Sequence, residues 1–240
     1  MNVSDKIINS ELLKTPWNHK IIDNFLDDSI FNKLNQISSL LLNKYGSSDI
    51  HGGVYPITQL LDDLNEDLIK EIMSVNVNLL SNAKNILNSF PKFRKYESYY
   101  SIPSFTILKP NLGDFPIHHD KITKSLSIVI YLYPKISTGT KLYKLDSEAS
   151  LDYTTTWKPN SALVFCGISN ETWHTFGTTE YPRITLNFSL QHNIFKDIKV
   201  LNNEVTVKVL PDSKLKIIPN DKNIENFYHL GLISDDKIKV

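Results

Sequence analysis

A four-residue run and one histidine far downstream carry side chains that bind metal ions. The run is Ile117-His118-His119-Asp120, and His174 lies within Thr172–Phe176, a second strand-like segment. Residues two apart on a β-strand leave the same face, so His118 and Asp120 would stand about 7 Å apart along one side of a strand. An imidazole and a carboxylate at that spacing can converge on one ion, with a third ligand from another strand. The sequence therefore predicts a metal site made by His118, Asp120 and His174.

The types of these three side chains favour a particular metal chemistry. Two imidazoles and one carboxylate on one face of an octahedron leave three positions open, which is the arrangement of non-haem Fe(II) oxygenases. A closed structural zinc site would use more thiolates. His119 is the alternative to His118 as first ligand, although strand parity places it on the face opposite Asp120.

A second polar pair follows nine residues after His174. Arg183 and Thr185 share one face of the expected strand Arg183–Gln191. A guanidinium beside a hydroxyl group is suited to binding a carboxylate. The chain thus combines a metal-binding pattern with a carboxylate-binding pattern, in the order His-X-Asp, His, Arg.

In this order and spacing the sequence resembles the Fe(II)/2-oxoglutarate-dependent dioxygenase superfamily, specifically its prolyl-4-hydroxylase-like branch. The resemblance covers about residues 16–190 and is most specific over 105–190. The segments that carry it are Pro16–Phe31, Asn111–His118, Ser127–Tyr133, Thr138–Leu142 and Trp157–Phe165, together with the residues above.

The resemblance implies an enzyme that uses Fe(II), 2-oxoglutarate and O2 to hydroxylate an unactivated C–H bond, with release of succinate and CO2. It assigns the iron ligands to His118, Asp120 and His174. The expected substrate is a prolyl peptide or a small molecule. The alternatives are a non-catalytic jelly-roll module that binds a metal or ligand, and a cupin-type metalloenzyme. Iron-dependent release of succinate would separate the three.

The resemblance also assigns residues to the cosubstrate. Arg183 matches the residue that binds the C5 carboxylate of 2-oxoglutarate, with Thr185 as a helper. Tyr131 matches a strand tyrosine that often contacts the same carboxylate. Two positions depart from the family pattern: Leu108 stands near the place of a cosubstrate-binding tyrosine, and Thr140 replaces a glycine. These departures concern the details of the pocket, because neither residue touches the metal.

The period of the apolar residues predicts the elements that position these side chains. Helical spacing predicts two helices in the first third, one ending at Gly46 and one that follows Asn65 and is closed by Pro91. After that the period changes to two. Strands are expected at Tyr99–Leu108, Phe115–Asp120, Ser125–Tyr133, Thr140–Leu145, Ala162–Cys166, Thr172–Phe176 and Arg183–Gln191.

Short strands at this spacing predict a mainly β fold with flanking helices: a double-stranded β-helix, or jelly roll, with N-terminal helices packed on one sheet. We expect one domain over 1–240, comprising a helical support (1–95), a jelly-roll catalytic core (96–191) and a C-terminal extension (192–240). His51-Gly52-Gly53, between the two helices, is a candidate lid over the substrate, and a structural or solvated role for His51 is the alternative.

Composition limits the partners and the compartment. Lys and Arg number 26, Asp and Glu also 26, and the pI is about 7.1, so the chain lacks the basic footprint of a nucleic-acid binder. One cysteine, Cys166, cannot form an internal disulfide, which is typical of a reducing compartment. The longest apolar run, Leu126–Tyr133, is too short to span a membrane. We therefore expect a cytoplasmic protein without nucleic-acid or membrane partners.

Overall fold

The structure, a computed structural model, describes most of the first 217 residues. The described ranges are 2–49, 53–93, 99–112, 115–121, 123–176, 180–192, 195–201, 204–209 and 213–217. They belong to two compact units, residues 1–192 and 193–240. That the chain behaves as one domain stays a prediction, and His51 and Gly52 of the candidate lid lie outside the described residues.

Helices occupy much of the N-terminal third. They are α1 (Val3–Asn9), α2 (Asp28–Tyr45), α3 (Glu66–Ser81) and α4 (Ala83–Asn88), with short 3-10 turns at Ile57–Gln59 (η1) and Glu148–Ser150 (η2). Asn65 caps α3, because its side chain accepts a hydrogen bond from the Leu68 N–H at 2.8 Å. The single helix expected up to Pro91 is divided at Asn82, whose side-chain amide donates to the Asn78 carbonyl at 2.9 Å. Such a bond competes with continued helix formation.

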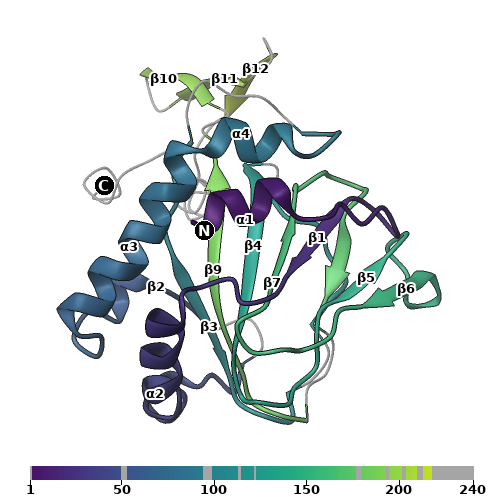
Figure 1. Cartoon of the computed structure of the whole chain (residues 1–240). Coiled ribbons are helices and arrows are strands. Elements are labelled where there is room, and N and C mark those ends of the chain that lie inside the picture. Colours follow the sequence, from purple (N-terminus) through teal and green to yellow (C-terminus); the bar gives the residue numbers. More distant parts are fainter. Residues whose placement is uncertain are drawn as a thin grey trace. The chain divides into compact units, whose positions relative to one another are not determined.

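Two antiparallel sheets form the body of the first unit (Figure 1). The larger has the order β1-β7-β4-β9-β3-β2, and the smaller has the order β6-β5-β8. The larger sheet contains β1 (His19–Ile22), β2 (Val54–Pro56), β3 (Ser104–Leu108), β4 (Lys124–Tyr133), β7 (Ala162–Phe165) and β9 (Arg183–Gln191). The smaller contains β5 (Lys141–Tyr143), β6 (Leu151–Thr154) and β8 (Trp173–Thr175). This architecture confirms the predicted jelly roll.

Two strand predictions need correction. β1 and β2 come from the N-terminal third, which therefore contributes strands to the sheet as well as helices. The expected strand Phe115–Asp120 does not form. Only His118 pairs, as an isolated bridge with His174.

The strand β9 separates two environments. Ile184, Leu186 and Phe188 belong to the apolar core between the larger sheet and the helices, which lie along one side of that sheet (Figure 1). Arg183 and Thr185 alternate with them and therefore leave the opposite face. That face meets the smaller sheet, where a second, small core contains Trp17, Leu142, Leu163 and Phe165.

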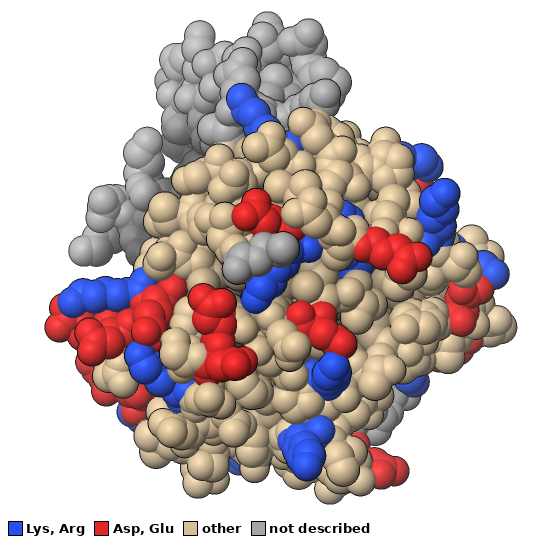
Figure 2. All heavy atoms as spheres, in the orientation of Figure 1, with Lys and Arg blue, Asp and Glu red and all other residues tan. Residues whose placement is uncertain are grey.

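The second unit contains an antiparallel sheet with the order β10-β11-β12. Its strands are Phe195–Leu201, Glu204–Val209 and Ser213–Ile217. Within the described ranges, no helix combines the length and the apolar character that crossing a bilayer requires. On the face seen in Figure 2, basic side chains are scattered among acidic and uncharged ones.

Candidate active site

The three predicted metal-binding residues converge in the structure. One ligand atom from each of His118, Asp120 and His174 lies within 4.8 Å of the other two. The backbone N–H of His118 donates to the His174 carbonyl at 3.1 Å, and that of His174 donates to the His118 carbonyl at 2.8 Å. Three ligand atoms on one face of an octahedron, each about 2.1 Å from the ion, lie about 3 Å apart, so the side chains would draw closer together around a bound ion.

Both imidazoles are oriented for binding a metal through Nε2. The Nδ1 of His118 donates to the Pro116 carbonyl at 3.0 Å, and the Nδ1 of His174 donates to the Thr172 carbonyl at 2.8 Å. A carbonyl can only accept, so Nδ1 carries the proton and Nε2 keeps its lone pair. Burial lowers the pKa of both side chains, that of His174 to about 4. Both rings are therefore neutral at pH 7, as metal binding requires.

Asp120 is ionised although it is only 7% exposed. Its Oδ1 accepts from the Lys124 ammonium at 2.8 Å, and its Oδ2 accepts from the Ser127 hydroxyl. Burial raises the pKa of Asp120, but Lys124, His174 and Ser127 lower it by more, so that the pKa lies well below its usual range. The site therefore offers one carboxylate and two neutral imidazoles.

The alternative ligand His119 lies apart from this group. Its ring packs edge-on against Trp173 at a centroid distance of 4.8 Å, and its Nδ1 donates to the Asp120 carbonyl at 3.0 Å. The group of three that converges contains His118 instead. The geometry favours His118 over His119.

Arg183, the predicted carboxylate-binding residue, is 3% exposed. Its Nη1 donates to the Thr138 carbonyl, and its Nη2 donates to the Thr140 hydroxyl at 3.3 Å. Its guanidinium lies 5.0 to 5.4 Å from the ring centroids of Trp157, Phe176 and Tyr131. Among the described residues no carboxylate pairs with Arg183, and burial lowers its pKa. A buried cation in this state is suited to an anionic ligand.

A cluster of three hydroxyl groups adjoins Arg183. The Tyr131 hydroxyl donates to Thr140 Oγ1 at 2.9 Å and lies 2.6 Å from Thr155 Oγ1. The Thr140 N–H donates to Thr155 Oγ1 at 2.7 Å. This approach depends on Gly139, because a Cβ there would lie 1.7 Å from the Thr155 carbonyl oxygen.

The hydrogen-bonding capacity of this region exceeds what its own contacts use. Three hydroxyl groups carry three protons, and the two contacts made by Tyr131 use at most two of them. Arg183 has five N–H donors, and its protein acceptors are the Thr138 carbonyl, the Thr140 hydroxyl and the Tyr131 hydroxyl. The contacts of the described residues therefore leave one O–H and two N–H groups for a ligand. A carboxylate would supply two oxygens with about four acceptor positions.

Thr185, predicted to assist Arg183, has a different partner in the structure. Its hydroxyl donates to Asn187 Oδ1 at 3.1 Å, and the Asn187 amide donates to Thr106 Oγ1 at 2.9 Å. Thr140 contacts the Arg183 guanidinium instead, and Thr155 contacts Thr140. Leu108 is fully buried and pairs with Arg183 across β3 and β9, so it contributes an apolar wall.

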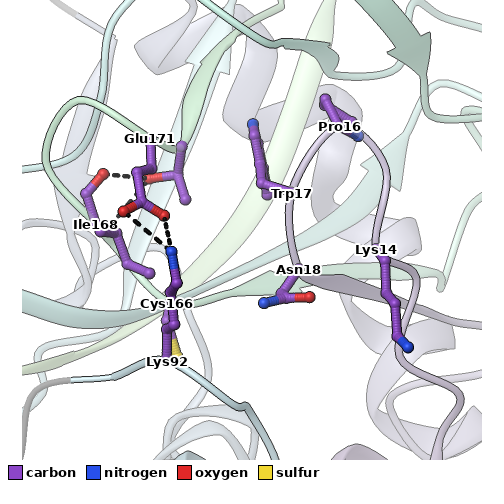
Figure 3. A pocket seen from close by; sticks show the side chains of 9 residues that line it. Lys14, Pro16, Trp17, Asn18, Lys92, Cys166, Ile168 and Glu171 are labelled. Atoms are coloured by element: carbon purple, nitrogen blue, oxygen red, sulfur yellow. Dashed lines mark hydrogen bonds and ion pairs between the residues drawn. The ribbon is translucent and has the colours of Figure 1, made fainter.

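A separate cavity of about 190 Å³ lies beside the segment that ends in β8 (Figure 3). It is lined by Lys14, Pro16, Trp17, Asn18, Lys92, Cys166, Ile168, Glu171 and Thr172. Lys92 and Glu171 form an ion pair at 3.1 Å beside it. Burial raises the pKa of the Cys166 thiol to about 12, so the thiol stays protonated and unreactive. None of the three converging metal-site candidates lines this cavity.

Comparisons with known proteins place the fold. Neither a protein-family model nor a curated protein matches the sequence. The structure is similar to a Pseudomonas putida prolyl-4-hydroxylase, with a TM-score of 0.50, 12% identity and coverage of 79% of this chain and 97% of that one. It is also similar to a Trichoplax adhaerens prolyl hydroxylase solved with a hypoxia inducible factor peptide fragment. Here the TM-score is 0.52 and the identity 14%, with coverage of 79% of this chain and 89% of that one. A prolyl 4-hydroxylase from Phytophthora capsici gives a TM-score of 0.52 and 13% identity, with coverage of 83% of this chain and 66% of that one.

At these identities the similarity concerns the fold. The first unit has the jelly roll of the prolyl hydroxylases. This agrees with the resemblance to the prolyl-4-hydroxylase-like branch that the sequence motifs carry.

Proposed function

We propose that the protein is an Fe(II)- and 2-oxoglutarate-dependent dioxygenase that hydroxylates an unactivated C–H bond and releases succinate and CO2. The observation that carries the proposal is the pairing of two features in one jelly roll. One is the convergent group of two neutral histidines and an ionised carboxylate. The other is the buried Arg183, which lacks a carboxylate partner among the described residues. A metal site alone would not require such a cation.

The residues fit Fe(II) by their chemistry. His118, Asp120 and His174 would hold the ion and leave coordination positions open for small ligands. The bound metal supplies activation of O2, coupled to oxidative decarboxylation of 2-oxoglutarate. The protein keeps the two imidazoles neutral through the Nδ1–H bonds to backbone carbonyls. It keeps Asp120 ionised through Lys124 and Ser127.

Arg183 would bind the C5 carboxylate of 2-oxoglutarate, with a hydroxyl proton of Thr140 or Thr155 as a further donor. Surrounding aromatic rings exclude water, which strengthens the attraction between the guanidinium and a carboxylate. Ser127 and Tyr131 mark the two ends of the site on β4, and the four residue steps between them span about 13 Å. The arginine side chain and a five-carbon diacid together can span that length.

The substrate proposal is a prolyl peptide or a small molecule. One structural neighbour was solved with a peptide fragment, so a peptide is the first class to test. Stimulation of 2-oxoglutarate turnover by candidate peptides and small molecules would identify the class.

The decisive experiment measures succinate formed from 2-oxoglutarate in the presence of Fe(II) and O2. We expect succinate release that depends on the protein, and its loss in His118→Ala. His119→Ala is the matched control, because it removes the same side chain from the neighbouring position, and it should keep activity. Metal binding without 2-oxoglutarate binding would instead favour a non-catalytic module or a cupin-type enzyme.

A further inference from the structure

Lys124 lies on the metal side of β4 because of a β-bulge. β4 and β9 pair Leu126 with Leu190 but Lys124 with Gln191, so β4 carries one extra residue at this point. By simple alternation Lys124 would share the helix side with Leu126. The bulge instead brings it to the face of Ser127. Bulges near functional sites commonly re-aim a side chain in this way.

A tight turn then returns Lys124 to the metal-site carboxylate. The Lys124 N–H donates to the Lys121 carbonyl at 2.9 Å, and the Lys124 ammonium lies 2.8 Å from Asp120 Oδ1. A Cβ at Gly167 would lie 2.7 Å from the Lys124 carbonyl oxygen, so the turn packs closely against that glycine. Bulge, turn and close packing together fix Lys124 beside Asp120.

The charges explain what this contact does. With neutral imidazoles, Asp120 contributes one negative charge and Lys124 one positive charge, so the group is balanced without a metal. Burying the Asp120 carboxylate without a partner would be costly. A divalent ion adds two positive charges next to the ammonium, and like charges at such short distances repel strongly.

We propose that Lys124 is an internal counter-ion of Asp120 that stabilises the metal-free site and weakens the binding of a divalent metal. The site therefore forms before metal arrives and releases its ion more readily than the three ligands alone would. This inference rests on the proposed role of Asp120 as a metal ligand. It makes Lys124 a positioning residue rather than a catalytic one.

The test compares the full-length wild type with Lys124→Met, Lys124→Arg and Lys121→Met. Lys121 is exposed and lies in the same turn, so Lys121→Met is the matched control. Two readouts are independent of turnover: the Tm of the metal-free protein, and the Mn²⁺ dissociation constant measured by electron paramagnetic resonance. Lys124→Met should lower the metal-free Tm by about 5 °C or more. It should tighten Mn²⁺ binding by about tenfold or more. Lys124→Arg and Lys121→Met should stay close to wild type in both.

An unchanged or weakened Mn²⁺ affinity in Lys124→Met would overturn the inference. An unchanged metal-free Tm would overturn the stabilising role. Failure of the proposed function is distinguishable: if the three residues are not a metal site, neither wild type nor Lys124→Met would bind Mn²⁺ there, and if they bind metal without 2-oxoglutarate turnover, the Mn²⁺ comparison still holds. The predicted change in Mn²⁺ affinity would be overturned only in the first case, and the Tm comparison would test the counter-ion role of Lys124 in both.

Discussion

The two ends of the candidate site handle buried charge in opposite ways. At the metal end, the Asp120 carboxylate has Lys124 at 2.8 Å and a hydroxyl donor from Ser127, so its charge is balanced by the protein. At the other end, Arg183 is 3% exposed and has only neutral acceptors and aromatic rings among the described residues. The charge of the metal end is therefore balanced in the absence of its ligand, and the charge of the Arg183 end is not.

This difference indicates what each end contributes to binding. At the metal end the three side chains already converge and their charge is balanced before the ion arrives, so binding requires them to close around the ion beside Lys124. The Arg183 end carries a desolvated cation that an anion would neutralise, so much of the affinity for a carboxylate should arise there. Substitutions at the two ends should therefore have different effects on the free and the ligand-bound protein.

The largest effect should come from removing a metal ligand. His118→Ala, Asp120→Ala and His174→Ala should each abolish succinate formation and weaken Fe(II) binding, because each removes one of three protein ligands. Anaerobic titration with Fe(II) and a succinate assay measure the two effects. If His119→Ala is inactive and His118→Ala is active, the ligand register is wrong.

Replacing Arg183 should have the next largest effect. Loss of one partner of a buried charged pair costs about 3–5 kcal/mol, so Arg183→Met should weaken 2-oxoglutarate binding by roughly two to three orders of magnitude. Fe(II) binding should persist, since Arg183 is not a ligand. Calorimetric titration of the anaerobic Fe(II) protein measures both.

The unbalanced charge of Arg183 gives this variant a second signature. Without ligand, Arg183→Met should be no less stable than wild type, because it removes a buried cation that lacks a carboxylate partner among the described residues. A large fall in Tm of the ligand-free variant would show that the comparison between the two ends is mistaken.

Acid should destabilise the metal-free protein through the metal end. His174 has a pKa of about 4 when folded, against 6.5 as its ordinary value. Between these values the unfolded chain binds a proton that the folded chain does not, so stability is lost as the pH falls from 6.5 toward 4. At pH 5 the loss from His174 is about 2 kcal/mol. Urea unfolding at pH 7 and pH 5 measures it, and Arg183→Met should show the same pH dependence as wild type.

The smallest effects should distinguish two threonines near Arg183. Thr155→Val removes a hydroxyl from the cluster of unused donors, and a neutral hydrogen bond contributes on the order of 1 kcal/mol, so 2-oxoglutarate affinity should fall by up to about tenfold. Thr185→Val should change it less, because the Thr185 hydroxyl is bonded to Asn187. The same calorimetric titration ranks them. The reverse ranking would restore Thr185 as the helper that the sequence resemblance implies.

The sequence predicted the site best where short-range spacing determines it. The spacing of His118 and Asp120 predicted that their side chains would approach one ion. They do converge with His174, even though the expected strand Phe115–Asp120 does not form. One backbone bridge brings His118 and His174 together, and Lys124 and Ser127 hold Asp120 beside them. The start of the helix after Asn65 was also predictable, because its apolar spacing is local.

Features set by long-range contacts were beyond the sequence. β1 is four residues long and largely buried on both faces, so it shows no alternation to recognise. Thr155 lies in the run Thr154-Thr155-Thr156, where nothing distinguishes it. Its position beside Arg183 results from the close approach at Gly139. Thr185 had the right parity, but the partner of its hydroxyl is a neighbour on its own strand.

The alternation along β9 bears on how such a protein diversifies. Ile184, Leu186 and Phe188 hold the helices to the sheet, whereas Arg183 and Asn187 face the opposite interior. Selection for folding and selection for ligand chemistry therefore act on alternating codons of one segment. Sequence can drift at one set of positions without disturbing the other, provided size and polarity persist. Chains that share only 12–14% identity with this one can thus keep the same architecture.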